Sequence, residues 1–247
     1  MPGHAFDSSA RWYDVLAGGA RRLEREGNLL LGALRRAPSR RVLDSACGTG
    51  IHALFLAENG GEVAACDLSA EMIEYAREHR PHPSVRHTVA DMRTPPPGPY
   101  GLALCLGNSL SLLDGAESLE AFFRNTAAVL EPGGLLLAQL LNYANPALRQ
   151  YRQRVENGGG EEFRVRAEKT FTPRADGTVL HIEFSVTSGG ETLNTGQTVL
   201  LRHWDRATLE RAASAAGLQP EECLGSFDGA PYAPESSPDL IMLWRRD

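Results

Sequence analysis

The chain has 247 residues, of which 42% are hydrophobic and 23% are charged, and its formal net charge is −6. This composition is typical of a globular protein, and the acidic balance argues against binding to nucleic-acid phosphate or anionic lipid, which needs a basic face. The four cysteines have no C-x-x-C spacing, and no other residues have metal-ligand spacing. We therefore expect neither a disulfide framework nor a metal site.

The N-terminal segment "MPGHAFDSSARW" lacks the apolar core of a signal peptide. The longest strongly apolar run, Leu135–Leu141, is too short to cross a bilayer. We therefore expect a cytoplasmic protein that has no membrane partner.

In chain order, a helical segment from Asp7 to Leu34 is broken by small residues at Ala17–Ala20. Strand-like and helix-like segments then alternate. The strands are "RVLDSAC", "GEVAACD", "SVRHTVA", "YGLALCL" and "LLLAQLLNY", and Ser69 is placed to cap the helix "AEMIEYAREH". Five strand–helix alternations predict the α/β class with a doubly wound, mostly parallel sheet.

After residue 160 the hydrophobic pattern changes to a period of two. "EEFRVRAEKTFT", "GTVLHIEFSVT" and "ETLNTGQTVLLRHW" predict a small antiparallel sheet of about three strands over residues 160–204. Helical periodicity returns at "DRATLERAASAAG", with Asp205 as its cap, and two further strands end the chain. Residues 1–150 and 205–247 are therefore predicted to form one domain, into which residues 160–204 are inserted.

Chemically useful residues follow the strands of the predicted parallel sheet, whose carboxyl ends share one edge. The first strand offers Asp44 before a glycine turn, the second ends in Asp67, and the third in Asp91 and Met92. Asp67 can accept two hydrogen bonds from a ribose diol, and Asp91 one from an adenine amino group, with Met92 against the ring. A helix cap for Asp67 and a turn aspartate for Asp91 are the alternatives. Together these residues indicate a site for an adenosine that carries a small group.

Five features taken together resemble the class I S-adenosylmethionine-dependent methyltransferases. They are "VLDSACGTG", "ACDLSAEMIEYAR", "ADM", "LEPGGLLL" and the terminal strand pair. The resemblance implies a Rossmann-like seven-stranded sheet, S-adenosylmethionine as the cofactor, S-adenosylhomocysteine as its product, and a small-molecule acceptor. Carried over by position, it implies that the cofactor contacts Arg22, Asp44, Ala46, Gly48, Gly50, Asp67, Leu68, Met72, Asp91, Met92 and Leu106, with Arg22 at the cofactor's carboxylate.

Within that family the chain is most similar to the glycine/sarcosine N-methyltransferases. The likeness lies in "LCLGNSLSLL", "LLNYANP", the predicted insert as a lid over the acceptor, "GSFDGAPY" and "ARWYDVLAG". It implies that Asn108 lies in the catalytic site, that Tyr13 closes over the cofactor, and that Tyr143 and Tyr232 line the acceptor pocket. A turn-forming role for Asn108 and a core role for Tyr13 are the alternatives.

Two departures from those enzymes concern the acceptor. Leu141 stands where they have an arginine that anchors the acceptor's carboxylate, and Leu112 stands where they have a histidine. A buried carboxylate without a partner is costly, so we expect an acceptor larger and less charged than glycine, methylated at an amine nitrogen.

Three other functions remain open on the sequence. An O-methyltransferase uses the same scaffold. An NAD-dependent oxidoreductase is suggested by Gly48, Gly50 and Ala53, which fit the loose pattern G-x-G-x-x-G/A, although the third glycine is missing. A non-catalytic S-adenosylmethionine-binding protein would keep the same cofactor residues.

Overall fold

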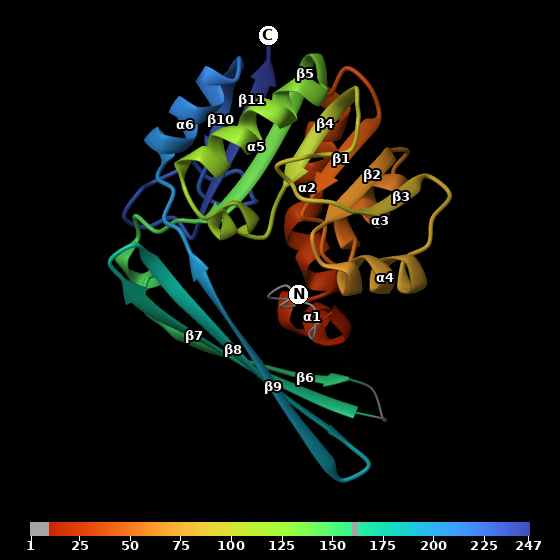
Figure 1. Ribbon diagram of the computed structural model, residues 1–247, viewed down its shortest axis with the longest axis vertical. Coiled ribbons are helices and arrows are strands. Elements are labelled where there is room, and N and C mark those ends of the chain that lie inside the picture. The colour runs from red at the N-terminus through yellow and green to blue at the C-terminus, as the bar shows by residue number, and fades with distance from the viewer. Residues whose placement is uncertain (1–9, 160–162) are drawn as a thin grey trace.

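The computed structural model describes residues 10–159 and 163–247. It consists of a large sheet with helices on both faces and a small antiparallel sheet at one end (Figure 1). The small sheet lies below the carboxyl ends of the parallel strands, with helix α1 (Ala10–Ala17) beside it (Figure 1).

The large sheet has seven strands in the order β10-β11-β5-β4-β1-β2-β3. Strands β1 to β5 are parallel, and β11 runs antiparallel to both of its neighbours. This confirms the predicted α/β class, the doubly wound sheet and the terminal antiparallel pair. The strands are β1 (Arg41–Ser45), β2 (Glu62–Asp67), β3 (Val85–Val89), β4 (Tyr100–Cys105), β5 (Leu130–Leu141), β10 (Leu218–Leu224) and β11 (Asp239–Arg246).

The predicted N-terminal helix is two helices, because Gly18 and Gly19 adopt positive φ angles of 88° and 49° between them. Residues 7–9 of that prediction lie outside the described residues. Ser69 caps α4 by accepting from the backbone N–H of Met72, as expected. The remaining helices are α2 (Ala20–Arg36), α3 (Ile51–Glu58), α4 (Ala70–His79), α5 (Ala116–Val129) and α6 (Arg206–Ala215), with 3₁₀ turns η2 (Ser109–Leu112) and η3 (Pro146–Leu148).

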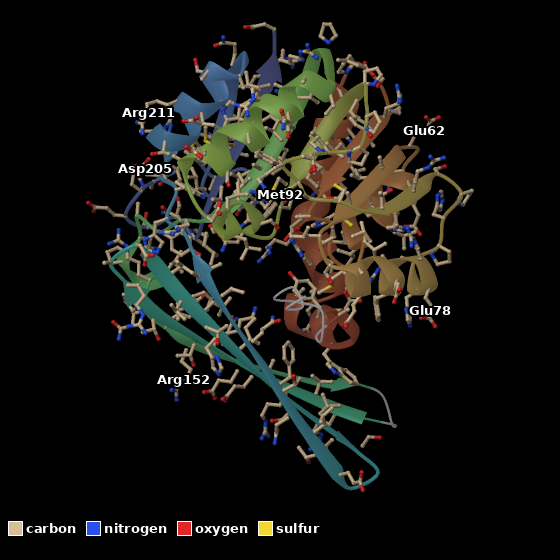
Figure 2. All side chains as sticks on the ribbon, viewed as in Figure 1. Glu62, Glu78, Met92, Arg152, Asp205 and Arg211 are labelled. Carbon is tan, nitrogen blue, oxygen red and sulfur yellow. The ribbon has the colours of Figure 1, made fainter. Side chains whose placement is uncertain are left out.

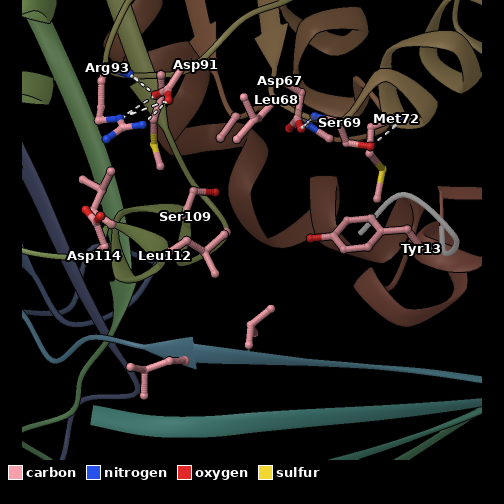
Figure 3. Close-up of a pocket in the computed structure, with 17 residues that line it drawn as sticks. Tyr13, Asp67, Leu68, Ser69, Met72, Asp91, Arg93, Ser109, Leu112 and Asp114 are labelled. Atoms are coloured by element: carbon pink, nitrogen blue, oxygen red, sulfur yellow. Dashed lines mark hydrogen bonds and ion pairs between the residues drawn. The ribbon is translucent and has the colours of Figure 1, made fainter. Parts of the chain in front are cut away.

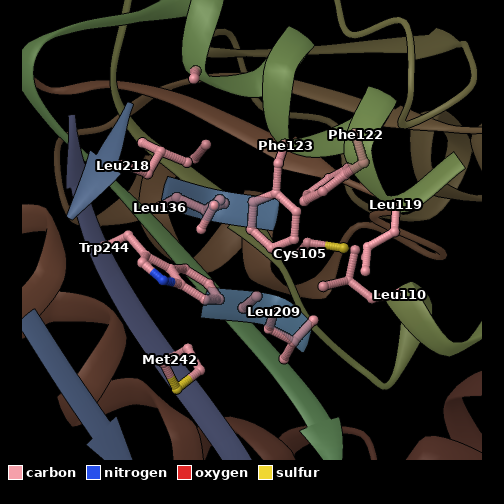
Figure 4. Close-up of a cluster of buried hydrophobic side chains, with 14 of the residues drawn as sticks. Cys105, Leu110, Leu119, Phe122, Phe123, Leu136, Leu209, Leu218, Met242 and Trp244 are labelled. Carbon is pink, nitrogen blue, oxygen red and sulfur yellow. The ribbon is translucent and has the colours of Figure 1, made fainter. Parts of the chain in front are cut away.

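Strand β4 shows why the central strands read as continuous apolar runs. Leu102 and Leu104 pack on one face of the sheet with α2 and α3, whereas Cys105 packs on the other with α5 and α6. On that second face the ring of Phe123 meets Trp244 edge-on at a centroid distance of 5.3 Å (Figure 4). Both faces of the sheet are therefore covered by helices, so the central strands have no alternating polar residues.

The small sheet has four strands, β6 (Arg152–Gly159), β7 (Phe163–Arg174), β8 (Gly177–Ser188) and β9 (Glu191–Leu201). The prediction found the last three and missed β6, whose sequence "RQRVENGG" carries almost no apolar alternation. The described strands of this sheet thus begin at Arg152 and end at Leu201, whereas the predicted insert was 160–204.

Hydrogen bonds tie the end of the small sheet to the large domain. The backbone N–H of Arg202 donates to the carbonyl oxygen of Ser111 at 2.7 Å, and the Trp204 indole donates to that of Leu110 at 2.8 Å. Met92 lies centrally, where the carboxyl edge of the large sheet faces the small one, whereas Arg152 and Arg211 lie at the periphery (Figure 2). No helix in the described ranges is long and apolar enough to span a bilayer.

Candidate active site

A cavity of about 460 Å³ opens where the carboxyl ends of the parallel strands face α1 and strand β9 (Figure 3). A narrow extension of about 30 Å³ continues from it beneath the glycine loop. Of the predicted cofactor residues, those on the walls of one or both are Arg22, Asp44, Ala46, Gly48, Asp67, Leu68, Met72, Asp91, Met92 and Leu106. Further residues on the wall of the larger cavity are Ser69, Arg93, Gly107, Ser109, Leu113, Asp114, Val199 and Leu200.

Asp67 is held rigidly at the end of β2. Its Oδ2 accepts from the backbone N–H of Gly48 at 2.8 Å, and its Oδ1 accepts from that of Ser69 at 2.9 Å. Gly48 has a φ of 54°, which brings its N–H toward β2 at little steric cost. A carboxylate offers about four lone-pair sites, so Asp67 keeps the capacity to accept further hydrogen bonds from a ligand in the cavity.

Gly50 does not line either cavity. Its φ is 79°, and a Cβ there would lie 3.0 Å from Nε2 of His87 and 3.1 Å from the Cβ of Ala76. The second glycine of the loop therefore serves the packing of α3 against the neighbouring elements, whereas Gly48 faces the ligand space.

A buried acid, Glu26, organises the narrow extension. Both of its oxygens accept from Nε of Arg22 at 3.1 Å, Oε1 accepts from Arg25 at 2.7 Å, and Oε2 contacts Nε2 of His52 at 2.7 Å. Burial raises the pKa of Glu26, but its bond to His52 and the charge of Arg22 outweigh that effect and lower the pKa to about 2. Burial and the Arg22 charge lower the pKa of His52, so the ring is neutral at pH 7 and donates to the Glu26 carboxylate.

Because Glu26 holds the Nε side of Arg22, the terminal nitrogens of the guanidinium point toward Gly107. A Cβ on Gly107 would lie 3.0 Å from Nη2 of Arg22. Across the extension, Asp44 is buried and its Oδ2 has no hydrogen-bond partner among the described residues. Burial raises the pKa of Asp44 to about 7 against the opposing charge of Arg22. A guanidinium beside a carboxyl group with one unpartnered oxygen complements the carboxylate and ammonium of an amino acid.

On the opposite wall, Asp91 is bound by a residue that the sequence analysis missed. Arg93 donates to Asp91 from its backbone N–H at 2.8 Å and from Nη2 at 2.6 Å. It also donates to Oγ of Ser118 at 3.1 Å, which fixes the carboxylate relative to α5. Met92 lies between them, so this wall offers one acidic and one apolar side chain.

Helix α1 covers the glycine loop and carries Tyr13. Thr49 donates to Oδ1 of Asp14 at 2.6 Å, and Arg80 forms an ion pair with Asp14, so α1 is joined to the loop and to the end of α4. The Tyr13 ring lines both parts of the cavity, and its hydroxyl points into the larger one (Figure 3). Burial raises the pKa of Tyr13, so the phenol stays protonated at neutral pH.

Comparison with known proteins agrees with this geometry. Residues 42–134 match the family described as a methyltransferase domain. A solved S-adenosylmethionine-dependent methyltransferase from Clostridium acetobutylicum superposes with a TM-score of 0.83 at 16% identity and covers 98% of each chain. The chain thus contains a region that matches a methyltransferase domain and has the fold of a solved S-adenosylmethionine-dependent methyltransferase.

Two further proteins are similar to this chain. Glycine N-methyltransferase of Oryctolagus cuniculus is 34% identical over 160 residues, which are 57% of this chain and 54% of that protein. The CcbJ methyltransferase of Streptomyces caelestis is 27% identical, with a TM-score of 0.71 over 91% of this chain and 89% of that one. The chain spans about half the length of the curated relatives it matches.

Asn108 lies outside the walls of the two cavities. Its Nδ2 donates to the Tyr143 hydroxyl at 2.9 Å, and its Oδ1 accepts from Ser111 at 2.9 Å and from the backbone of Leu141 at 3.0 Å. The side chain thus joins η2 to the end of β5. Asn108 itself adopts a φ of 67°, a conformation that asparagine tolerates better than most residues.

Tyr143 and Tyr232 also lie off the cavity walls. Tyr143 is buried, bonded to Asn108 and stacked on His203 at a centroid distance of 4.3 Å. The Tyr232 hydroxyl donates to Oδ1 of Asn142 at 2.9 Å. Both tyrosines therefore hold segments that lie behind the cavity walls.

The part of the cavity wall that lies toward strand β9 is lined by apolar side chains. Leu112 is 39% exposed and lines the wall with Val199 and Leu200 of β9. Leu141 packs with Tyr143, Phe171 and Val199 in an adjoining cluster. In the described part of the chain, no three His, Cys, Asp or Glu side chains form a group that could hold a metal ion.

Proposed function

We propose that the protein transfers the methyl group of S-adenosylmethionine to an amine nitrogen of a small molecule larger than glycine. The observation that carries this proposal is the pair of joined cavities. The larger one offers Asp67 and apolar side chains to a nucleoside, and the extension offers Arg22 and Asp44 to an amino acid. S-adenosylmethionine contains both parts.

The residues present fit this cofactor. Arg22 would bind its carboxylate and Asp44 its ammonium, which would supply the hydrogen bond that Oδ2 of Asp44 lacks among the described residues. Asp67 would accept from the ribose diol, and Asp91 from the adenine amino group, with Leu68, Met72 and Met92 around the ring. Ala46, Gly48 and Leu106 would approach through their backbones.

The bound cofactor supplies an electrophilic methyl group on a sulfonium, and its in-line displacement leaves S-adenosylhomocysteine. The chain's own contribution is positioning and the exclusion of water. Helix α1, joined to the glycine loop through Asp14, and strand β9, joined to η2, cover the cavity from two sides. The Tyr13 hydroxyl directs a dipole into the space that they enclose.

We propose that Asn108 is a positioning residue for η2, whose Leu112 forms the acceptor wall. Its amide already bonds to Tyr143, Ser111 and Leu141, so its effect on an acceptor would pass through the shape of this turn. We also propose that the small sheet acts as a lid on the acceptor side, because Val199 and Leu200 of β9 line the cavity.

The cavity volume and the leucines on its wall support an acceptor with an apolar body. The 34% identity to a glycine N-methyltransferase supports nitrogen as the methylated atom.

The test is a release assay for S-adenosylhomocysteine with amines and hydroxyl compounds of matched skeleton, such as benzylamine against benzyl alcohol and aniline against phenol, with glycine included. Turnover of amines above glycine and above their hydroxyl partners is expected. Turnover of the hydroxyl compounds alone would establish an O-methyltransferase. Tight binding of S-adenosylhomocysteine without turnover of any compound would favour a non-catalytic binding protein.

A further inference from the structure

Lys169 is the only lysine in the sequence; every other residue among its 25 lysines and arginines is arginine. It lies in β7 of the small sheet, within "RAEKTFT". An arginine keeps its charge in almost any surroundings, whereas a lysine amine changes its pKa readily when buried. The surroundings of this one lysine therefore influence its charge near neutral pH more than they influence that of any arginine.

The strand register places Lys169 on the face of the small sheet that is turned toward the large domain. Val165, Ala167 and Phe171 are buried, and they share the parity of Lys169 along β7, whereas Arg164 and Arg166 are exposed. Alternate residues of a strand point to the same face. Across the sheet, Lys169 pairs with Ile182 of β8, which is also buried.

Lys169 is not among the wall residues of either cavity, but the neighbouring positions on both sides of it along this face lead to those walls. On one side, the row of Phe171 includes Val199 of β9, which lines the cavity wall. On the other side, the cluster that includes Ala167 packs against Tyr13, which lines both cavities. Residues two apart in a strand are about 6.6 Å apart. Lys169 therefore stands between two groups of side chains that both contact the ligand space.

The positive charge of Lys169 is not compensated by the residues beside it in the sheet. Its row partners Gln153, Ile182 and Gln197 are uncharged. In the part of the chain that the structure describes, no carboxylate acts on its ammonium, and the one charge that does is the guanidinium of Arg22 across the cavity. Burial, assisted by Arg22, lowers the pKa of Lys169 to about 8. Lys169 is half-buried, so at pH 7 most of the protein carries a partly desolvated cation, which a paired anion would stabilise.

We propose that Lys169 binds an anionic group, a carboxylate or a phosphate, on the methyl acceptor. This inference rests on the proposed function, since it names the class of acceptor for the same site. It replaces the expectation of an acceptor less charged than glycine, because Lys169 supplies the partner for an anion that Leu141 and Leu112 do not. The acceptor would place its anion against the lid and its apolar body against Leu112, Val199 and Leu200. Arg22 is not the alternative anchor, because it faces Gly107 at the amino-acid end of the cofactor site.

The uniqueness of Lys169 makes a direct test available. Protein grown with isotope-labelled lysine gives one lysine side-chain signal in NMR spectra, which needs no further assignment. In the presence of S-adenosylhomocysteine, this signal is followed through pH titrations with acetate, benzoate or phosphate, and with benzamide as the neutral match to benzoate. We expect at least one anion, and not benzamide, to raise the pKa of Lys169 from near 8 toward its ordinary value of about 10.4.

Variants test the role of the charge. Lys169→Met is expected to weaken anion binding at least about tenfold, whereas Lys169→Arg, which keeps the cation, is expected to stay within about threefold of the wild type. Binding to the wild type is expected to fall as the pH rises through about 8, where the ammonium loses its proton, and Lys169→Arg should not show this fall.

Three outcomes would overturn the proposal: no response to any of the three anions, an equal response to benzamide, or equal anion binding by Lys169→Met. An activity that rises through pH 8 and is lost in Lys169→Arg would contradict it too, because it would make Lys169 a base. Calorimetry with S-adenosylhomocysteine is done first. If that titration fails, the proposed function fails, whereas a failure of the anion steps alone concerns only Lys169.

Discussion

The buried network around Glu26 gives a prediction whose size follows from the structure. Glu26 is fully buried and accepts hydrogen bonds from Arg22, Arg25 and His52. Glu26→Gln keeps the shape of the side chain, but it removes the charge and turns one acceptor into a donor that faces other donors. We expect this variant to be less stable and to hold Arg22 less well.

Two estimates of the stability loss agree. Breaking a buried ion pair by removing one partner costs about 3–5 kcal/mol. The pKa of Glu26 lies at about 2 instead of 4.5, and at 1.36 kcal/mol for each pH unit this corresponds to about 3 kcal/mol. Because the folded pKa is lowered, this stability is present above pH 4.5 and is lost as the pH falls toward 2.

The assay is urea unfolding of the wild type and of Glu26→Gln between pH 3 and pH 7. The control is Glu24→Gln, an exposed glutamate on the same helix, which should stay within about 0.5 kcal/mol of the wild type. We expect the free energy of unfolding of Glu26→Gln to be about 3 kcal/mol below that of the wild type at pH 7, and this difference to narrow below pH 4.5. Equal stability of Glu26→Gln and Glu24→Gln at pH 7 would refute the role assigned to the network.

Three further predictions concern the cavity walls. Gly107→Ala and Gly133→Ala both place alanine at positive φ, so each should cost about 1 kcal/mol of stability. Only Gly107→Ala should weaken S-adenosylhomocysteine binding in calorimetry, because its Cβ would lie 3.0 Å from Arg22. Equal loss of binding in both variants would contradict this. Because the pKa of Asp44 is raised, its ionisation destabilises the ligand-free protein between pH 4 and 7. The free energy of unfolding of Asp44→Asn should therefore rise by about 3 kcal/mol relative to that of the wild type over this range. The variant should also bind S-adenosylmethionine less tightly. A difference in free energy of unfolding that stays constant across this pH range would contradict the role given to Asp44. Leu112→Asp should lower turnover and leave S-adenosylhomocysteine binding unchanged, with Leu193→Asp at the exposed end of the small sheet as the control; equal turnover in the two would exclude Leu112 from the acceptor wall.

The sequence predicted those parts of the fold that local patterns determine. Continuous apolar runs separated by glycine turns and helical periods indicated the order of strands and helices, and period-two segments indicated the small sheet. Strand β6 escaped because its pairing with β7 depends on backbone hydrogen bonds and not on an apolar pattern. In such a strand the partner creates the structure, and the local sequence does not.

The proposed cofactor residues were predictable to the extent that they follow strands at the sheet edge. Asp67 and Gly48 meet there because the carboxyl ends of neighbouring parallel strands share that edge. Gly50 belongs to the same motif, yet its lack of a side chain serves contacts with His87 and Ala76, which come from segments distant in sequence. A motif therefore identifies a loop without saying which of its glycines faces the ligand.

Residues whose roles depend on long-range contacts were not found. The bond between Glu26 and His52 joins α2 to α3, and only the Arg22–Glu26 spacing of four residues hinted at it. Asn108 was singled out by resemblance, but the bonds of its amide depend on where β5 ends. Lys169 could have been noticed from composition alone, since it is the only lysine, but its burial follows from the register of the small sheet.

The central claim is that the joined cavities bind S-adenosylmethionine through Asp67. The most direct measurement is calorimetric titration of the protein with S-adenosylmethionine and S-adenosylhomocysteine, with NAD as a competing ligand class. Asp67→Ala is compared with Glu62→Ala, an exposed residue at the start of the same strand. We predict micromolar binding of both S-adenosyl compounds, at least about a tenfold loss in Asp67→Ala alone, and no binding of NAD. Binding of NAD, or equal affinity in the two variants, would contradict the account.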